Sequence, residues 1–364
     1  MKGGVNMRRK LLFVVLIVAL LSLIGFVTGY AQSQASIKLR FSNPLPVTYS
    51  STPVVGQFCE EIKKRTNGRV EIAYYPGGTL TTFPKVYDGV LNQVSDIGLS
   101  HIGYTRGRFL VTEMLDLPVG MPSGFVASHV KHDFYKKFKL KEWNDVHLLF
   151  LWSPGPQIFA LGKRPFKKLE DLKGLKIRGI GRPADTIKAL GAVPVALEMG
   201  DVYDAAQRGL LDGIMEVMET WKGFRLGDVI NYGALTQRGA GLVYTFYVAM
   251  NKEKWDALPD DIKKIFVEMS EEWVDRLGVR TLEADFEGLD YFKQRGGQMI
   301  TLPEEEIKKI AKAVEPVIEN YMKEMEAKGF KMGEMDEQLK YIRERLAYWS
   351  KQERERKLRS PYIQ

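Results

Sequence analysis

Arg178 lies where a known motif and a candidate binding group coincide. It ends a short apolar strand, after which Gly179, Gly181 and Ala184 have the G-x-G-x-x-A spacing of a dinucleotide-binding loop, with Glu198 further on. Three features oppose a nucleotide: a strand pair precedes the motif, the following helix is short, and the leader described below directs the chain away from cytoplasmic nicotinamide cofactors. We therefore interpret the glycines as turn residues and expect no cofactor.

The Arg178 side chain suits a different task. Open α/β sheets bind ligands at the C-terminal ends of their parallel strands. A guanidinium held there can bind a carboxylate through two parallel charge-assisted hydrogen bonds. The other interpretation is a structural or solvent-exposed arginine, since the chain has 53 lysines and arginines in total.

Other reactive side chains give weaker patterns. His129 and His132, beside Asp133, have a spacing that could start a zinc site, but no further ligand lies nearby and lysines surround them, so we expect surface histidines and no metal. Cys59 falls in an apolar helical pattern and is interpreted as a buried core residue. No nucleophile elbow, zincin motif or Walker loop is present in the sequence, so we predict no catalytic residues and no enzyme.

The first 31 residues are predicted to be a signal peptide. Residues 1–10 carry four basic residues and no acidic one, residues 11–27 are apolar, and Gly29 and Ala31 fit the −3 and −1 positions of a cleavage site. An uncleaved membrane anchor is the alternative. Removing these four basic residues lowers the net charge of +8 to +4, which gives no case for nucleic acid. We expect a periplasmic or otherwise extracytoplasmic protein.

The remaining chain alternates between strands and helices. Residues 37–99 have a β-α-β-α-β pattern, and a second series of strands and helices runs from residue 147 to 216. A strand over 244–251 precedes a helical stretch over 259–296, read as one long helix or two, with Gly288 as a possible kink. A helix over 304–328, kinked at Pro316, and a charged amphipathic segment over 333–360 complete the chain.

Several motifs resemble those of one family of transport proteins. The stretches FKKLEDLKGLKIR (166–178), LGAVPVAL (190–197) and DVYDAAQRGLLDG (201–213), with further matches at 67–80, 95–109 and 258–266, resemble the periplasmic solute-binding subunits of TRAP transporters, the DctP family. The resemblance covers about residues 37–330. It implies an α/β two-domain clamshell of the periplasmic-binding-protein type, with open sheets flanked by helices and joined by hinge strands and a long domain-spanning helix.

The same resemblance implies the domain limits. Domain I would comprise residues 37–154 plus 244–283, and domain II residues 155–243 plus 284–330. Residues 331–364 would form a charged C-terminal helical extension that lies on the surface or packs on a second copy of the chain. We expect a monomer, with a dimer through the C-terminal helix as the alternative.

The resemblance also implies a ligand site. It assigns the ligand carboxylate to Arg178, and it places five further positions near the ligand: Glu216, Met199, Asn43, His101 and Gln157. Trp221, near Glu216 in sequence, could accommodate an apolar or aromatic side chain of the ligand. A second basic residue found in sialic-acid-binding members is absent near Ile158, which argues against sialic acid. The implied function is capture of a small organic acid and its delivery to an ion-gradient-driven TRAP membrane permease.

Glu216 raises a charge problem, because it would face an anionic ligand. Either it is protonated or paired with Lys222 or Arg182, or the ligand carries an ammonium group of its own. We expect a monocarboxylate or keto acid, with an aromatic or apolar amino acid as the alternative. Two other functions stay open at this point: an extracytoplasmic enzyme acting on a carboxylate, and a ligand-sensing subunit of a signalling system.

Overall fold

The structure is a computed structural model that describes residues 36–362, so the predicted signal peptide lies outside the described residues. Internal contacts divide the chain into Met1–Ile37 and Lys38–Gln364, and the second unit holds all elements discussed below except the first residue of the first strand. Among the described residues, no helix combines the length and the apolar content that crossing a bilayer requires.

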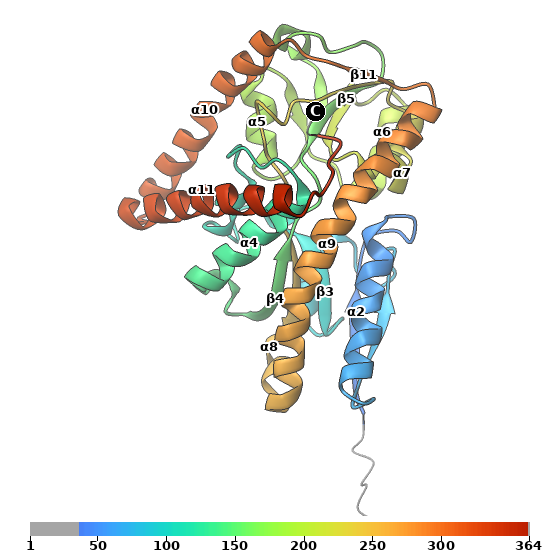
Figure 1. Cartoon of the computed structure of the whole chain (residues 1–364), viewed down its shortest axis with the longest axis vertical. Helices are drawn as coiled ribbons and strands as arrows, with labels where there is room; N and C mark the ends of the chain where they lie inside the picture. The colour runs from blue at the N-terminus through green and yellow to red at the C-terminus, as the bar shows by residue number, and fades with distance from the viewer. Residues whose placement is uncertain (1–35, 363–364) are drawn as a thin grey trace, which may run out of the picture. The chain divides into compact units, whose positions relative to one another are not determined.

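Sheet A has five strands in the order β2-β1-β3-β10-β4 (Figure 1). Strands β1 and β3 are parallel, with Phe41 opposite Ile97, whereas β10 runs antiparallel to both β3 and β4. The early β-α-β pattern therefore does form a parallel pair, and a strand from much later in the chain completes the sheet. The strands are β1 (Ile37–Ser42), β2 (Val70–Tyr75), β3 (Ile97–His101), β4 (Val146–Trp152) and β10 (Phe246–Asn251).

Sheet B has six strands in the order β11-β9-β5-β8-β6-β7. Its centre is mixed, because β6 is parallel to both β7 and β8, while β5 is antiparallel to β8 and β9. Strands β11 and β9 form a further parallel pair at the other edge. The strands are β5 (Ile158–Leu161), β6 (Lys176–Arg178), β7 (Val193–Val195), β8 (Gly213–Glu216), β9 (Tyr232–Ala234) and β11 (Gln298–Ile300).

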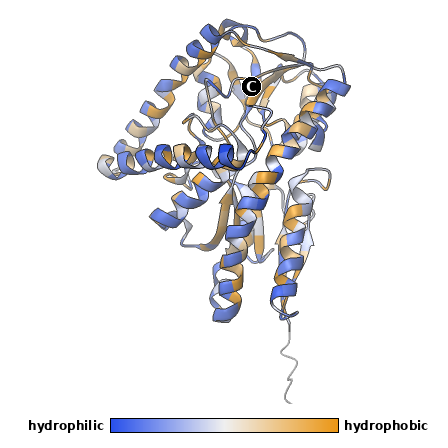
Figure 2. Cartoon of the chain, in the orientation of Figure 1, coloured by the Kyte–Doolittle hydropathy of each residue, from blue (hydrophilic) through white to orange (hydrophobic). Residues whose placement is uncertain are grey.

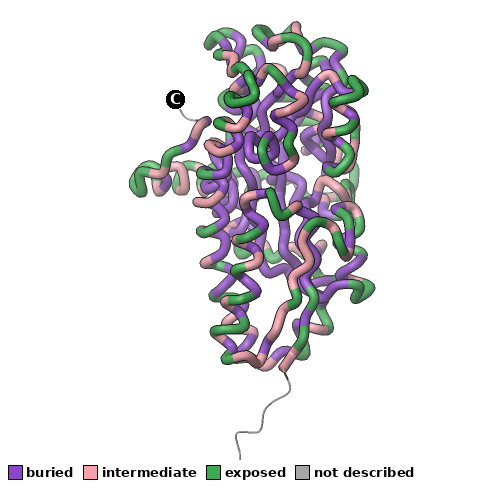
Figure 3. Tube along the Cα trace, turned by 90° about the vertical axis from the view of Figure 1, so that its right-hand side faces the viewer, coloured by how far each residue is buried: buried purple, intermediate pink, exposed green. Residues whose placement is uncertain are grey.

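Helices flank both sheets, and their apolar faces supply much of the core. In Figure 2, α2 and α9 show hydrophobic residues interleaved with hydrophilic ones, as expected of helices with one buried face. Figure 3 shows buried stretches in the interior of the trace and exposed residues along the outer faces of helices and in loops. The helices are α2 (Ser51–Arg65), α3 (Val86–Leu91), α4 (Gly124–Phe138), α5 (Pro183–Ala189), α6 (Val202–Gln207), α7 (Glu219–Gly223), α8 (Lys252–Asp256), α9 (Asp260–Gln294), α10 (Glu304–Ala327) and α11 (Met332–Glu355).

Helix α9 is one continuous helix of 35 residues, which settles the choice between one helix and two. It packs against α2, α4 and β4 on the sheet A side and against α7 on the sheet B side (Figure 1). Its predicted apolar stripe, including Phe266 and Trp273, is buried, and each such side chain contributes about 1.5–3 kcal/mol by leaving water. Gly288 does not break the helix. A Cβ at this position would overlap the carbonyl of Met218, so glycine permits the close crossing of α9 and the start of α7.

The C-terminal extension packs on its own chain. Helix α11 lies against α4, where Arg345 and the indole N–H of Trp349 both bind Asp133, at 2.6 and 2.7 Å. The chain then returns toward sheet B and buries Tyr362. The Tyr362 hydroxyl accepts a hydrogen bond from the Met218 backbone N–H at 3.2 Å. The extension thus contacts elements of both sheets, and the apolar face of α11 is covered by α4.

Candidate functional site

Parallel strands bring the two central charges of the site together. Strands β6 and β8 are parallel neighbours, with Ile177 opposite Gly213 and Arg178 opposite Ile214. Since both strands end at the same edge of sheet B, Arg178 and Glu216, the last residues of the two strands, meet there. Both side chains are almost fully buried, and Arg178 Nη1 forms an ion pair with Glu216 Oε1.

The remaining donors of the guanidinium are also used. Nε and Nη2 of Arg178 donate to the Leu197 carbonyl at 3.2 and 3.0 Å. Nη2 also donates to the Tyr104 hydroxyl at 3.2 Å, and Nη1 to the Tyr244 hydroxyl at 3.4 Å. Tyr104 follows β3 and Tyr244 precedes β10, so an arginine of sheet B is held by two hydroxyl groups from the sheet A side.

A small cavity surrounds this arginine. Its volume is about 20 Å³, which is room for about one water molecule, so an organic acid enters only when the surrounding groups move apart. The walls are mostly aromatic and apolar, and they come from both sheets. The lining residues are Leu45, Tyr49, Phe83, His101, Tyr104, Pro154, Arg178, Met199, Glu216, Val217, Thr220, Phe224, Tyr244 and Phe246.

The lining residues carry one cation and one anion. Burial raises the pKa of Glu216, although the neighbouring Arg178 favours the carboxylate. Burial opposes the charge of Arg178 as well, but Glu216 and the tyrosines outweigh it and raise the guanidinium pKa. Burial, followed by the charges of Arg178 and Lys131, holds the pKa of His101 well below its usual range, so this ring is neutral near pH 7.

Four of the seven predicted site residues line this cavity. Arg178, Glu216, Met199 and His101 come from separate stretches of chain, and the structure brings them together. The His101 ring packs between aromatic side chains, including Tyr104 and Tyr244, whose ring centroids lie at 4.3 and 4.6 Å. The Met199 backbone N–H donates to the Tyr104 hydroxyl at 3.0 Å, which links the two halves of the wall.

The other three predicted residues do not line the cavity. Asn43 stabilises its own loop, since it accepts a hydrogen bond from the Leu45 N–H at 3.0 Å and donates to the Tyr74 hydroxyl at 2.6 Å. Trp221 is a core residue whose ring packs on Phe292 at 4.6 Å. Gln157 is buried just before β5, and among the described residues its side-chain amide has no hydrogen-bond partner.

The expected cationic partners of Glu216 were wrong. Lys222 points to α9, where its ammonium binds Glu287 at 2.7 Å. Arg182 binds Glu113 and Glu324 instead. The partner of Glu216 is Arg178 itself, which the sequence analysis had reserved for the ligand. His129 and His132 lie apart from the cavity; they are buried and not at the surface as expected, and His132 pairs with Glu271 of α9 at 3.2 Å.

Sequence reasoning missed the aromatic wall. Tyr104 follows the predicted His101 by three positions, and Tyr244 begins the stretch predicted as a strand, yet neither had a pattern that indicated a site. In the structure β10 begins at Phe246, so Tyr244 lies before the strand and can reach across to Arg178. The only sequence signal was proximity to a strand end, which many residues share.

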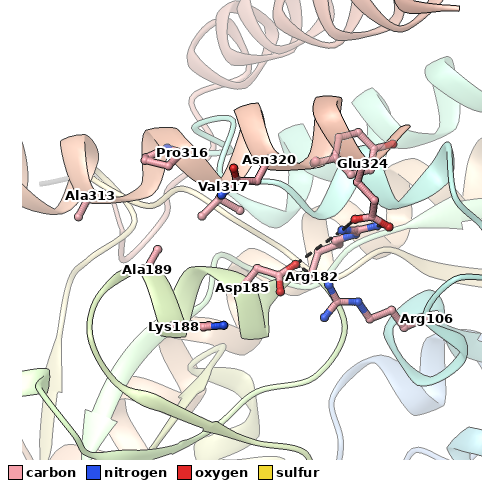
Figure 4. Close-up of a pocket in the computed structure, with 11 residues that line it drawn as sticks. Arg106, Arg182, Asp185, Lys188, Ala189, Ala313, Pro316, Val317, Asn320 and Glu324 are labelled. Carbon is pink, nitrogen blue, oxygen red and sulfur yellow. Dashed lines mark hydrogen bonds and ion pairs between the residues drawn. The ribbon is translucent and has the colours of Figure 1, made fainter. Parts of the chain in front are cut away.

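A second group of charges joins the two sheets beside the cavity. Arg106, which follows β3, donates to the Gly181 carbonyl at 3.2 Å and binds Asp185 at 2.7 Å. Arg182 binds Glu113, from the sheet A side, at 2.6 Å and Glu324 of α10 at 2.5 Å. Figure 4 shows Arg106 and Arg182 side by side, pointing toward Asp185 and Glu324 in the hollow of about 500 Å³ between α5 and α10.

Gly181 explains the glycine spacing of the opening motif. Its φ of +63° lies in the left-handed region, and a Cβ added to it would be 2.7 Å from the Cα of Gly103, a residue that follows β3. The helix after it, α5, has only 7 residues. The glycines thus allow the backbones of the two sides to touch, which agrees with the turn interpretation and not with a nucleotide loop.

Comparison with known proteins gives a consistent result. Residues 43–325 match the model of the DctP family, described as bacterial extracellular solute-binding protein, family 7. A solute-binding protein of Albidiferax ferrireducens is 27% identical over 70% of this chain and 76% of its own length.

Solved structures share the fold. A TRAP periplasmic solute-binding protein from Desulfovibrio salexigens has a TM-score of 0.74 at 28% identity, and the match covers 85% of this chain and 96% of that protein. Its structure is an open complex with the C-terminus of a symmetry mate bound in the ligand-binding site. A TRAP solute-binding protein from Rhodoferax ferrireducens, in complex with copurified benzoate, has a TM-score of 0.81 at 25% identity, with 87% and 99% covered. The two sheets and their flanking helices thus match the two-domain clamshell of TRAP solute-binding proteins, as the resemblance implied.

Proposed function

Because the chain belongs to the DctP family of bacterial extracellular solute-binding proteins, we propose that it captures a small organic acid with a single carboxylate at Arg178 and delivers it to a TRAP membrane permease driven by an ion gradient. The observation that carries this proposal is the buried guanidinium of Arg178, which lies at the edge of sheet B and contacts hydroxyl groups from the sheet A side. A carboxylate can replace these contacts with two parallel hydrogen bonds.

The cavity walls support the size and polarity of this ligand. Among the lining residues only Arg178 is cationic, so a second ligand carboxylate would have no positive partner in the cavity. Rings such as Phe83, Phe224 and Phe246 offer apolar surface to a carbon skeleton. The benzoate held by the Rhodoferax ferrireducens relative is a monocarboxylate of this kind.

Closure of the clamshell follows from the same contacts. A ligand bound to Arg178 and to Tyr104 touches both sheets, so it has a higher affinity for the closed form and shifts the population toward it. We propose that residues 37–154 plus 244–283 move against residues 155–243 plus 284–330. We also propose that residues 1–31 direct the chain to the periplasm.

A thermal-shift measurement tests the proposed function. The mature chain would be heated with a panel of monocarboxylates, dicarboxylates and neutral analogues. A ligand present at 100 times its Kd should stabilise it by about 2.7 kcal/mol, which raises the melting temperature of a chain of this length by about 4 °C. Arg178→Ala should abolish the response. Lys176→Ala, an exposed position on the same strand, should retain it.

A second variant covers the possibility that Arg178→Ala fails to fold. Removing this cation alone leaves Glu216 buried without a partner, whereas replacing both residues with methionine removes the pair together. If a carboxylate stabilises this double variant as much as the native chain, the assignment of the site is wrong.

A further inference from the structure

The cavity is electrically balanced before any ligand enters. Arg178 and Glu216 are the only ionised residues of its lining, and they neutralise each other. A simple monoanion that takes the donors of Arg178 would leave the site with an excess negative charge, because Glu216 would stay buried beside it. Such a buried, unpaired carboxylate is costly.

No other cation of the described residues is available to Glu216. Lys222 is held by Glu287 at 2.7 Å, and Arg182 by Glu113 and Glu324. Lys131 is buried under β10 and binds Asp116 and the Thr245 hydroxyl. His101 in the cavity wall is neutral. The compensating positive charge must therefore arrive with the ligand, or Glu216 must take up a proton.

We infer that the ligand is an α-amino acid with an apolar or aromatic side chain, whose carboxylate binds Arg178 and whose ammonium group binds Glu216. This inference rests on the proposed function, which it narrows to one chemical class. It makes Glu216 the residue that determines specificity, because this carboxylate distinguishes an amino acid from the keto acid or hydroxy acid with the same skeleton.

The geometry of the strands fits such a ligand. Arg178 and Glu216 end neighbouring strands, which lie about 4.8 Å apart, and in an α-amino acid only one carbon separates the carboxylate from the ammonium group. Each ligand charge then meets the opposite charge of the protein and the cavity stays neutral. The aromatic residues of the cavity wall, such as Phe83 and Phe224, remain for the apolar side chain of the ligand.

Matched ligands test the inference directly. L-phenylalanine, phenylpyruvate and 3-phenyllactate differ only at the α-carbon, and the corresponding series for leucine and alanine vary the side chain. Calorimetric titration of the native protein should show the amino acid of at least one series binding on the order of 100-fold more tightly than its keto and hydroxy analogues.

Substitution of the acid should remove this preference. In Glu216→Gln the affinity for the amino acid should fall by on the order of 100-fold, while that for the keto acid stays equal or rises. A second measurement needs no variant: titrations in buffers of different ionisation enthalpy count the protons taken up. The amino acid should bind with no net proton uptake, whereas a simple acid should take up close to one proton through Glu216.

The outcomes separate the inference from the proposed function. If a keto or hydroxy acid binds the native protein as tightly as its amino acid, and Arg178→Ala abolishes that binding, the proposed function stands and the inference is overturned. The same conclusion follows if Glu216→Gln leaves amino-acid affinity unchanged, or if simple acids bind tightly only with added sodium or calcium ions. If no member of any series binds but another monocarboxylate of the thermal-shift panel does, the inference is overturned and the proposed function stands. If nothing in the panel binds either, both fail.

Discussion

Glu113→Gln should weaken ligand binding, although Glu113 does not line the cavity. Glu113 and Arg182 form a buried ion pair of 2.6 Å, with 3% and 4% of their side chains exposed, and it joins the sheet A side to the sheet B side. In the variant, the amide can still accept a hydrogen bond from the Gly107 N–H through its oxygen. The amide nitrogen then faces Arg182 and cannot accept from it, so the contact between the two sides is lost.

The size of the effect follows from the burial of the pair. A hydrogen bond to a charged group contributes about 1.5–3 kcal/mol, and we take about 2 kcal/mol for this one. If the pair forms only when the clamshell is closed, its loss lowers the ratio of closed to open forms by about 30-fold, since 1.4 kcal/mol corresponds to a factor of ten. The apparent Kd of a ligand that binds the closed form should rise by up to that factor.

Calorimetric titration of a ligand found by thermal shift would measure this change. Glu324→Gln is the matched control, because it removes the other partner of the same arginine, on α10, whose side chain is 36% exposed. We expect the control to change the binding free energy by less than about 1 kcal/mol. Equal affinities of Glu113→Gln and the native protein would refute the assignment of this ion pair to the closed form.

Three further predictions concern stability. Gly181→Ala should lower the melting temperature by several degrees, since its Cβ would clash with Gly103, and Gly174→Ala, where nothing lies within 4 Å, should lower it less. Tyr362→Ala should reduce the free energy of unfolding in urea by about 3–5 kcal/mol. Burial raises the pKa of Glu219 to about 7, so the folded state binds this proton more tightly than the unfolded state does. The resulting stabilisation, fully present below pH 4, should decline by about 3 kcal/mol as the pH rises to 7. In Glu219→Gln, urea titrations across that range should show no such decline.

The fold and the centre of the site could be predicted because local patterns carry them. The apolar stripe that includes Phe266 and Trp273 indicated the long helix, and that helix is continuous. The position of Arg178 at the end of a short strand predicted its place at a sheet edge. Glu216 was placed near the ligand by the family resemblance, and the parallel pairing of β6 and β8 in the structure brings it beside Arg178.

The rest of the site depends on contacts between distant segments, which local spacing does not encode. Tyr104 and Tyr244 reach Arg178 from residues 74 and 66 positions away. Lys222 is near Glu216 in sequence and was expected to pair with it, but it lies on a part of α7 that faces α9. Asn43 was expected to meet the ligand, and instead it stabilises its own loop.

The crossing of α9 and α7 at Gly288 constrains how the protein can move. The helix meets the Met218 carbonyl there without an intervening side chain. If α9 slid along its axis, the Cβ atom of another residue would be brought against this carbonyl. The crossing can then serve as a fulcrum, and closure becomes a rotation about it with little translation. In such a rotation the displacement of a group grows with its distance from the crossing. An ion pair far from it, such as that of Arg182 and Glu113, therefore breaks or forms while the contact at Gly288 hardly changes.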